Sequence, residues 1–410
     1  MIPPVLVRTD VVRRAIVLGN GLSAATVSFD IAAQGFDVDL LLIGEELVEP
    51  AIYAFQDEPG RQDTITKMAI IHSSAHIRLH RHCEILTVRG HAGDFEISFN
   101  EGGRSRCVKG GAIVLAHEPD LVEEETSEAS VVTNNSLRGI IDANGTIPNV
   151  VVFIEGSNGK GSCPFQSATA SIENALAIKK RRPETQVYVL ARDVDAPGTF
   201  ERTYQMAQRK GVVFVRGDLS YRLSLDDPGS LIINDPVIGE IRVRPDLIVR
   251  EATFDIQSNS HLARKLGLRS SDNGMVQGFS TRLHAGETKR EGVFVCQGLN
   301  ASLLASDNIS EACAVASSVS ELLSRSFLEH GAEVAIVDKE KCSACLACVR
   351  ICPYDAPLLD EKGKAEIQVA ICQGCGMCVS LCPSKAIDQK RWTDARLSAE
   401  IIIVSKGEGG

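Results

Sequence analysis

Two cysteine-rich runs in the C-terminal part of the chain contain the residues that most clearly indicate a chemical function. They read CSACLACVRICP (342–353) and CQGCGMCVSLCP (372–383), and each follows the pattern C-x2-C-x2-C-x3-C-P. Together they hold eight of the thirteen cysteines in the 410-residue chain. Cysteine thiolates with this spacing are typical ligands of cubic [4Fe–4S] clusters, which carry single electrons.

The spacing also predicts how the eight thiolates are shared. Three cysteines at every third position can surround one cube from a tight loop, whereas the fourth lies one turn further on and reaches the cube of the other run. Pro353 and Pro383 stop each loop from continuing as helix, and Gly374 and Gly376 let the backbone approach the sulfides. We expect two clusters, one on Cys342, Cys345, Cys348 and Cys382, the other on Cys372, Cys375, Cys378 and Cys352.

Zinc and disulfide bonds are the alternative uses of clustered cysteines. Structural zinc sites usually use pairs of cysteines separated by a longer spacer and need four ligands per ion. The spacing here instead places three cysteines close together and a fourth further on. Disulfides are uncommon in a reducing compartment. Iron–sulfur clusters do no bond chemistry alone, so their presence implies a nearby centre that gives or takes electrons.

A second candidate site lies near the N-terminus, in VLGNGLSAA (17–25). Gly19, Gly21 and Ala24 form a G-x-G-x-x-A pattern directly after a strand-like run and at the start of a helical one. Such glycines allow a tight turn and let a pyrophosphate touch the backbone at a helix N-terminus. The pattern predicts a dinucleotide site for FAD or NAD.

One element of that dinucleotide motif is missing. The acid that should end the second strand and bind a ribose hydroxyl is absent, because Asp39 comes too early in the strand and Glu45 and Glu46 come late. A Rossmann fold that has lost its nucleotide therefore remains an open alternative.

Alternating strands and helices must position these motifs. The pattern predicts an α/β protein with two Rossmann-like dinucleotide-binding-type domains, of the flavoprotein disulfide-reductase kind, and a C-terminal α+β two-cluster ferredoxin domain. We expect the first part of an FAD-type domain over 1–145 and a second Rossmann-like domain without an NAD motif over 146–265. The chain should then return to the FAD-type domain over 266–330 and end in the ferredoxin domain with its tail over 333–410.

The choice between FAD and NAD depends on the segments around the first unit. Residues 76–117 alternate apolar and polar positions as in a β-meander, which favours FAD. EGVFVCQG (291–298) looks like the strand and glycine that flavoproteins place beside the ribityl chain. In the second unit, the glycines after the strand do not have the G-x-G-x-x-G spacing of a nucleotide-binding loop; they are Gly156, Gly159 and Gly161. We therefore expect no NAD(P)H site.

Composition narrows the class of protein. The formal net charge is −10, with scattered acidic and basic residues, which argues against a nucleic-acid binder. The longest apolar runs are too short for a transmembrane segment, and the N-terminus lacks the apolar region of a secretory signal. These features indicate a cytoplasmic protein.

The chain resembles the HdrA family, the flavin-carrying A-type subunits of heterodisulfide reductases and their relatives. The resemblance covers most of the chain, and these stretches carry it: VVFIEGSNGKGSCPF, DPVIGEIRVRPDLIVRE, GLRSSDNGMVQGF, GVFVCQG, the ferredoxin module and WTDARLSAEI. It implies FAD held between iron–sulfur clusters, with electron pairs split or merged between partner subunits in an anaerobe. Such subunits occur in heterodisulfide reductase, in the quinone-interacting complex of sulfate reducers and in class II benzoyl-CoA reductase.

The resemblance also implies which residues meet the cofactor, and the sequence departs from the family at several places, the missing acid of the second strand among them. The region around Cys163 is normally rich in cysteine and ligates a further cluster; here Cys163 stands alone, so we expect none. The usual Ala-Thr-Gly after the meander is Ala116-His117-Glu118. The expected FAD-binding residues are Gly19, Gly21, Ser23, Ala24, Gly298, Asp307 and Asn308.

Three functional hypotheses follow. The first is an electron-transfer subunit that relays, or bifurcates, electrons between FAD and partner iron–sulfur and flavin subunits through two clusters, with no substrate chemistry of its own. The second is a flavin-less wiring scaffold, and direct use of NAD(P)H is a third hypothesis. A metal site on His76, His80 and His82 is conceivable because a strand would place them on one face, but a solvated or hydrogen-bonded face is the better interpretation.

Overall fold

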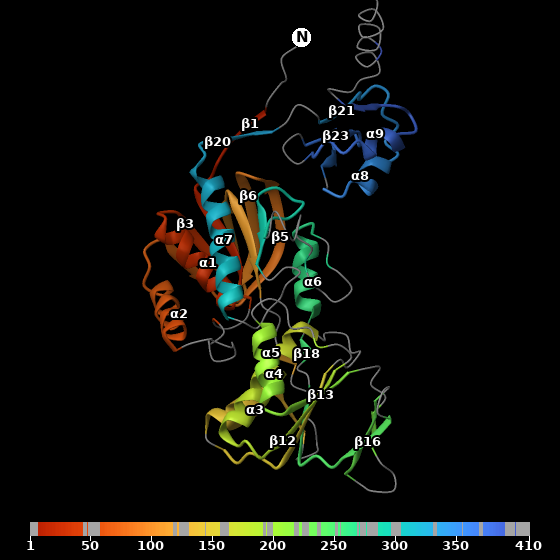
Figure 1. Cartoon of the computed structure of the whole chain (residues 1–410). Coiled ribbons are helices and arrows are strands. Elements are labelled where there is room, and N and C mark those ends of the chain that lie inside the picture. Colours follow the sequence, from red (N-terminus) through yellow and green to blue (C-terminus); the bar gives the residue numbers. More distant parts are fainter. Residues whose placement is uncertain are drawn as a thin grey trace, which may run out of the picture.

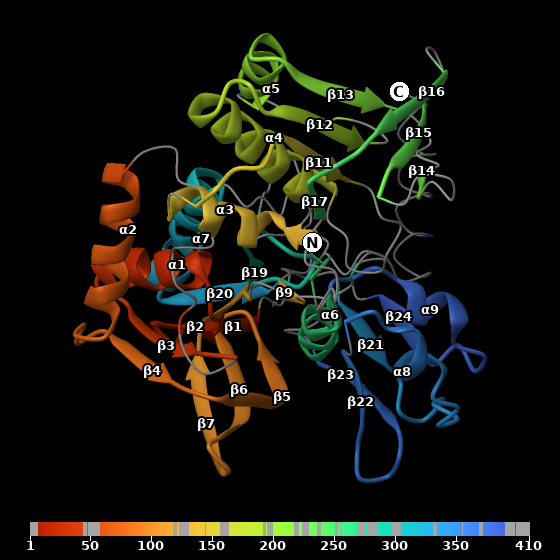
Figure 2. The same cartoon turned by 90° about the horizontal axis from the view of Figure 1, so that it is seen from below.

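The computed structural model of the chain contains two α/β regions and a small cysteine-rich module (Figure 1, Figure 2). The described residues are 7–43, 47, 58–117, 121–122, 131–143, 145–155, 164–191, 194, 200–216, 221–223, 229–235, 239–250, 253–254, 256–268, 270, 276, 286–296, 305–330, 334–354, 356–368, 372–389 and 398. In Figure 1 the second α/β region and the cysteine module lie at opposite ends of the first region.

The first region is built on a five-stranded parallel sheet, and all of its strands except β4 are buried on both faces. Its strands, in spatial order, are β19 (Val293–Val295), β8 (Ala112–Ala116), β2 (Arg14–Gly19), β3 (Asp37–Leu41) and β4 (Ile77–His80). The apolar runs AIVLG and AIVLA suit this position, because a parallel sheet covered on both sides needs continuous hydrophobic strands.

Two layers cover that sheet. Helices α1 (Leu22–Ala33), α2 (Glu58–Ile71) and α7 (Ala305–Ser324) pack on one face. The other face packs against a meander and helix α6 (Ile256–Lys265). The meander strands are β5 (Cys83–His91), β6 (Asp94–Glu101) and β7 (Arg104–Gly110).

One predicted boundary is wrong. The alternation predicts a meander that begins at residue 76, but Ile77–His80 is the fourth parallel strand of the sheet, with Ile77 opposite Val38. The meander begins only at Cys83, after His82 turns the chain with a φ of 51°. Alternation alone does not distinguish the two arrangements, because β4 is an edge strand with one covered face.

The second region repeats the parallel architecture. Its sheet has the order β10 (Val131–Thr133), β17 (Leu247–Arg250), β11 (Val150–Ile154), β12 (Gln186–Ala191) and β13 (Val212–Arg216). Helices α3 (Asn134–Asp142), α4 (Pro164–Arg181) and α5 (Phe200–Arg209) pack on one face. An antiparallel sheet covers the other: β14 (Tyr221–Leu223), β15 (Leu231–Asp235) and β16 (Gly239–Val243).

The chain passes from the first region to the second and returns. Short antiparallel strands β9 (Leu121–Val122) and β18 (Thr253–Phe254) pair where the two crossings meet. After the return, β19 joins the first sheet beside β8, and α7 packs along α1. Strand β20 (Phe327–His330) then pairs with β1 (Val7–Asp10) before the cysteine module.

The module has two antiparallel strand pairs and two short helices. Strand β21 (Ala335–Val337) pairs with β24 (Ile387–Gln389), and β22 (Pro357–Leu359) pairs with β23 (Ala365–Ile367). Helices α8 (Ala347–Ile351) and α9 (Met377–Leu381) each begin inside one cysteine run. Two Rossmann-type sheets and this α+β module confirm the predicted fold class. None of the described helices is both long enough and apolar enough to cross a membrane.

Candidate cluster and cofactor sites

The eight cysteines of the two runs line two separate cavities in the module. The cavity volumes are about 350 and 340 Å³, their open mouths included. The first is lined by Cys342, Cys345, Cys348 and Cys382, and the second by Cys352, Cys372, Cys375 and Cys378. Each cavity therefore receives three cysteines from one run and the fourth from the other, which is the crossed sharing that the spacing predicts.

The loops that carry these cysteines have matching backbone conformations. The residue before the second cysteine of each run has a positive φ, 54° at Ala344 and 63° at Gly374. The residue after it does too, with 62° at Leu346 and 74° at Gly376. These left-handed residues wrap each loop around its cavity and start the helix that carries the third cysteine.

The arrangement of the thiols favours a cluster over a single ion. Among the described residues, no three His, Cys, Asp or Glu side chains gather closely enough to hold one metal ion. A zinc site would need four ligands to converge on one point, whereas a cube needs them around a volume. The cysteines surround a volume.

The thiols of the second cavity affect one another electrostatically. Burial raises the pKa of the Cys378 thiol to about 11, and the charges of Cys372, Cys352 and Cys375 add to that rise in this order. Cys352 comes from the other run and lines the same cavity as Cys378. Thiolates that repel one another in this way are stabilised when positive iron ions lie between them.

Cys382 has a different environment. Burial alone would raise the pKa of its thiol, but hydrogen bonds from Ser384 and from nearby backbone amides together lower it. The amide of Ala386 donates to Sγ at 3.2 Å. A backbone amide aimed at a ligand sulfur stabilises thiolate charge and tunes the potential of a bound cluster.

The second cavity lies close to the first α/β region. Tyr354 and Gln373, neighbours of the second-cavity cysteines, line a further cavity of about 270 Å³. Its other wall consists of Gly90–Ala92 at the end of β5, together with Arg290 and Glu291 before β19. The module therefore meets the first region at the amino edge of its sheet, since β19 begins just after Glu291.

The predicted nucleotide-binding residues lie at the opposite, carboxyl edge of that sheet. Gly19 ends β2, Gly21 caps α1, and Ser23 and Ala24 are buried in its first turn. A Cβ on Gly19 would overlap the carbonyl of Ala116 on β8 and lie 2.9 Å from the amide of His117. Glycine is therefore required here by the neighbouring strand, whether or not a pyrophosphate binds.

The start of α7 provides the strongest sign that this edge accepts a ligand. Asn308 is 1% exposed, and its Nδ2 has no hydrogen-bond partner among the described residues. A buried donor without an acceptor is costly, so a polar ligand that accepts from it would stabilise the site. The side chain of Asp307 and all of Gly298 lie outside the described residues.

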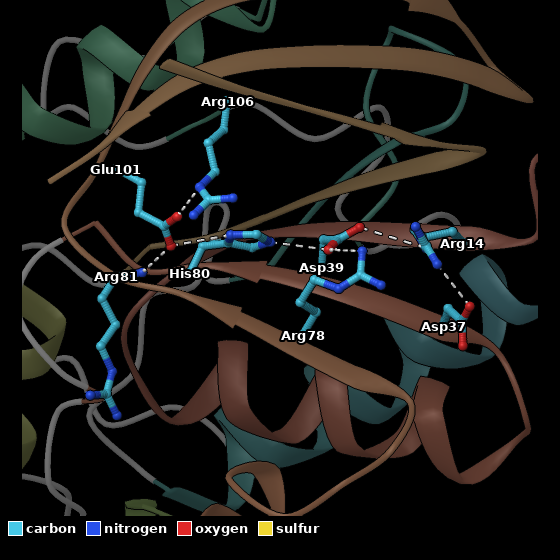
Figure 3. A network of polar contacts seen from close by, with 8 residues as sticks. All are labelled: Arg14, Asp37, Asp39, Arg78, His80, Arg81, Glu101 and Arg106. Carbon is cyan, nitrogen blue, oxygen red and sulfur yellow. Dashed lines mark hydrogen bonds and ion pairs between the residues drawn. The ribbon is translucent and has the colours of Figure 1, made fainter. Parts of the chain in front are cut away.

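Of the acids near the end of the second strand, Glu45 and Glu46 lie outside the described residues, and Asp39 has other contacts. Asp39 is in mid-strand with its side chain 1% exposed, and its Oδ1 lies 3.1 Å from Nε2 of His80 (Figure 3). Nδ1 of His80 lies 3.2 Å from Oε1 of Glu101 on the meander, and Arg14 approaches Asp39 from β2. These residues tie the sheet to the meander instead of facing a cofactor.

The three histidines considered as a metal site do not come together. His76 contacts Asp37 at 3.1 Å, His80 belongs to the buried network, and His82 lies beyond the end of β4. Sequence reasoning missed this network, because Glu101 comes from a strand far along the chain. It also missed that His117, a departure from the family pattern, contacts Asn20 in the glycine loop. Cys163 lies outside the described residues.

Comparisons with known proteins agree with both parts of the structure. The family described as "4Fe-4S dicluster domain" matches residues 335–383. An HdrA-like heterodisulfide reductase protein of Archaeoglobus profundus is 31% identical over 45% of this chain and 27% of its own length. An HdrA iron–sulfur protein of the CoB–CoM heterodisulfide reductase of Methanopyrus kandleri is 31% identical over 63% of this chain and 42% of its own length.

The chain thus spans less than half the length of these two relatives. Among solved structures, thioredoxin reductase of T. acidophilum superposes with a TM-score of 0.49 and 13% identity, over 75% of this chain and 98% of that one. The cluster motif, the two Rossmann-type sheets and the relatives agree, and over these shares of its length the chain is similar to HdrA-type proteins of heterodisulfide reductases.

Proposed function

We propose that this protein is an electron-transfer subunit of a larger redox complex, with two [4Fe–4S] clusters and one FAD. The observation that carries the proposal is the pair of cavities, each lined by three cysteines of one run and one of the other. Two cavities of this composition support two clusters per chain. The carboxyl edge of the first sheet, with the donor of Asn308, supports a flavin site in the same chain.

The residues of the chain would hold and tune these groups. The eight cysteine thiolates would bind the iron, and amides such as that of Ala386 would stabilise the sulfur charge. The backbone around Gly19–Gly21 and the N-terminus of α1 would face the pyrophosphate, and Nδ2 of Asn308 would donate to the flavin part. When bound, FAD supplies the exchange of electron pairs, and the clusters carry single electrons.

The proposed roles of FAD and the clusters imply partner subunits that supply and accept electrons. Since the described residues give no sign of a substrate site apart from these cavities and the carboxyl edge, electrons would arrive from and leave to other iron–sulfur and flavin subunits. One relative, from Methanococcus maripaludis, is named as the HdrA component of an H(2)/formate:CoB-CoM heterodisulfide,ferredoxin reductase. The candidate complexes are those of the heterodisulfide reductase, quinone-interacting and class II benzoyl-CoA reductase kinds. The most specific form of the proposal is that the flavin bifurcates electrons.

An oxygen-free purification tests the proposal. Iron, zinc and acid-released flavin are measured on one sample, and co-purifying subunits are identified. We expect about eight iron atoms per chain, little zinc and about one FAD. Far fewer iron atoms, or zinc in their place, would contradict the cluster assignment.

A second candidate is the flavin-less wiring scaffold. Two observations favour it: Gly19 is explained by the carbonyl of Ala116 alone, and Asp39 is engaged by His80. Full iron content together with no FAD, even after incubation with excess FAD, would select the scaffold over the flavoprotein.

A further inference from the structure

The carboxyl ends of β2 and β8 meet where the strand order of the first sheet reverses. From β2 the chain proceeds to β3 and β4 on one side, while β8 and β19 lie on the other. Ligands of open α/β sheets bind in the crevice above such a point. Gly19 is in register with Ala116, so the next residues, Asn20 and His117, emerge side by side at this crevice.

Asn20 and His117 form a buried polar pair. Their exposures are 4% and 3%, and Nδ1 of His117 lies 3.1 Å from Oδ1 of Asn20. A carboxamide oxygen can only accept, so Nδ1 is the donor in this contact. The bond connects the loop after β8 to the middle residue of the Gly19-Asn20-Gly21 turn.

That connection matters because of what the turn does. Two glycines around one residue give the turn many accessible conformations, and each is lost when a ligand orders the backbone. A side-chain tether on the central residue restricts these conformations beforehand. Pre-organisation of this kind improves affinity by lowering the entropy lost on binding.

We propose that His117 is a positioning residue for the dinucleotide: through Nδ1 it holds Asn20, and thereby keeps the glycine turn in the shape that receives the pyrophosphate. The inference rests on the proposed FAD site. It assigns a role to one of the departures from the family, since the histidine in place of threonine contacts Asn20 in the turn. None of the described residues at the end of β3 is an acid that could hold the dinucleotide, so in this proposal the shape of the turn carries more of the binding.

A pair of substitutions separates positioning from direct contact. His117→Asn keeps a nitrogen donor near the place of Nδ1, whereas His117→Gln keeps one near the place of Nε2. Full-length protein with its clusters intact and flavin removed is titrated with FAD, and binding is followed by flavin fluorescence. We expect His117→Asn to bind within about threefold of the wild type, and His117→Gln and Asn20→Ala to bind about tenfold more weakly, as for one lost hydrogen bond.

The thermal midpoint and the iron content of the flavin-free variants provide the second readout. For a positioning role, all three variants keep the iron content of the wild type, His117→Asn also keeps its midpoint, and FAD affinity falls only in His117→Gln and Asn20→Ala, which lose the bond. Tighter binding by His117→Gln than by His117→Asn would overturn the inference, because Nε2 would then be the important atom. Equal loss in all variants together with lower midpoints would also overturn it, in favour of a purely structural pair.

Failure of the proposed function has a different signature. In that case the wild type itself takes up no FAD while its iron content remains full. The flavin site, and this inference with it, would then be rejected, whereas the cluster assignment would stand.

Discussion

The cysteine module and the carboxyl edge of the first sheet differ in how their sites are assembled. All eight cluster cysteines lie between Cys342 and Cys382, and each loop repeats the same backbone conformations. The carboxyl edge instead combines Gly19, His117 and Asn308, which come from β2, the end of β8 and α7. The geometry of a local motif is set within one short segment of the chain, whereas a site built from distant segments exists only once the sheet has formed.

The largest expected effect concerns the crossed sharing of cysteines in the module. Cys352→Ser should remove the cluster of the Cys372 run and leave the other, so iron falls from about eight to about four per chain. The reason is that Cys352 lines the second cavity, with Cys372, Cys375 and Cys378. Iron analysis of anaerobic protein measures the loss.

Double variants make this prediction sharp. Cys352→Ser combined with Cys378→Ser affects one cavity twice, so iron should stay at about four per chain. Cys352→Ser combined with Cys348→Ser affects both cavities, and iron should fall to nearly none. The reverse ranking of the two double variants would mean that each run binds its own cluster.

The contrast between local and distant sites also explains what the sequence could predict. The cysteine spacing anticipated the lining of both cavities, and the apolar runs anticipated strands such as β2 and β8. The position of β4 was missed because an edge strand and a meander strand share one periodicity. The Asp39–His80–Glu101 network was missed because it depends on pairings between β3, β4 and β6 that no local pattern encodes.

The second prediction tests whether the glycine turn is a requirement of the fold. Gly19→Ala should destabilise the flavin-free protein by about 3 kcal/mol, because the new Cβ meets backbone atoms of Ala116 and His117 that cannot move aside cheaply. Chemical unfolding of the first region measures it. FAD should not restore the loss, since the overlap lies within the sheet.

Gly139→Ala in α3 is the matched control for this substitution. No atom lies within 4 Å of the Cβ that it would add, and the site is inside a helix. Alanine should therefore stabilise the protein by up to about 1 kcal/mol. If Gly19→Ala behaved like Gly139→Ala, the close approach of β2 and β8 would be wrong, and a pyrophosphate would become the better explanation for the glycine.

The smallest effect compares the two cysteine loops with each other. Ala344 and Gly374 occupy equivalent positions with φ of 54° and 63°, but only glycine adopts this conformation without strain. Ala344→Gly should therefore raise the anaerobic thermal midpoint of the module, and Gly374→Ala should lower it, each by about 4–8 °C for a change near 1 kcal/mol. Iron content should not change, because neither residue supplies a thiol. A lower midpoint in both variants would show that the loops are not equivalent and that the methyl group of Ala344, which lines the first cavity, contributes more through packing than it costs in strain.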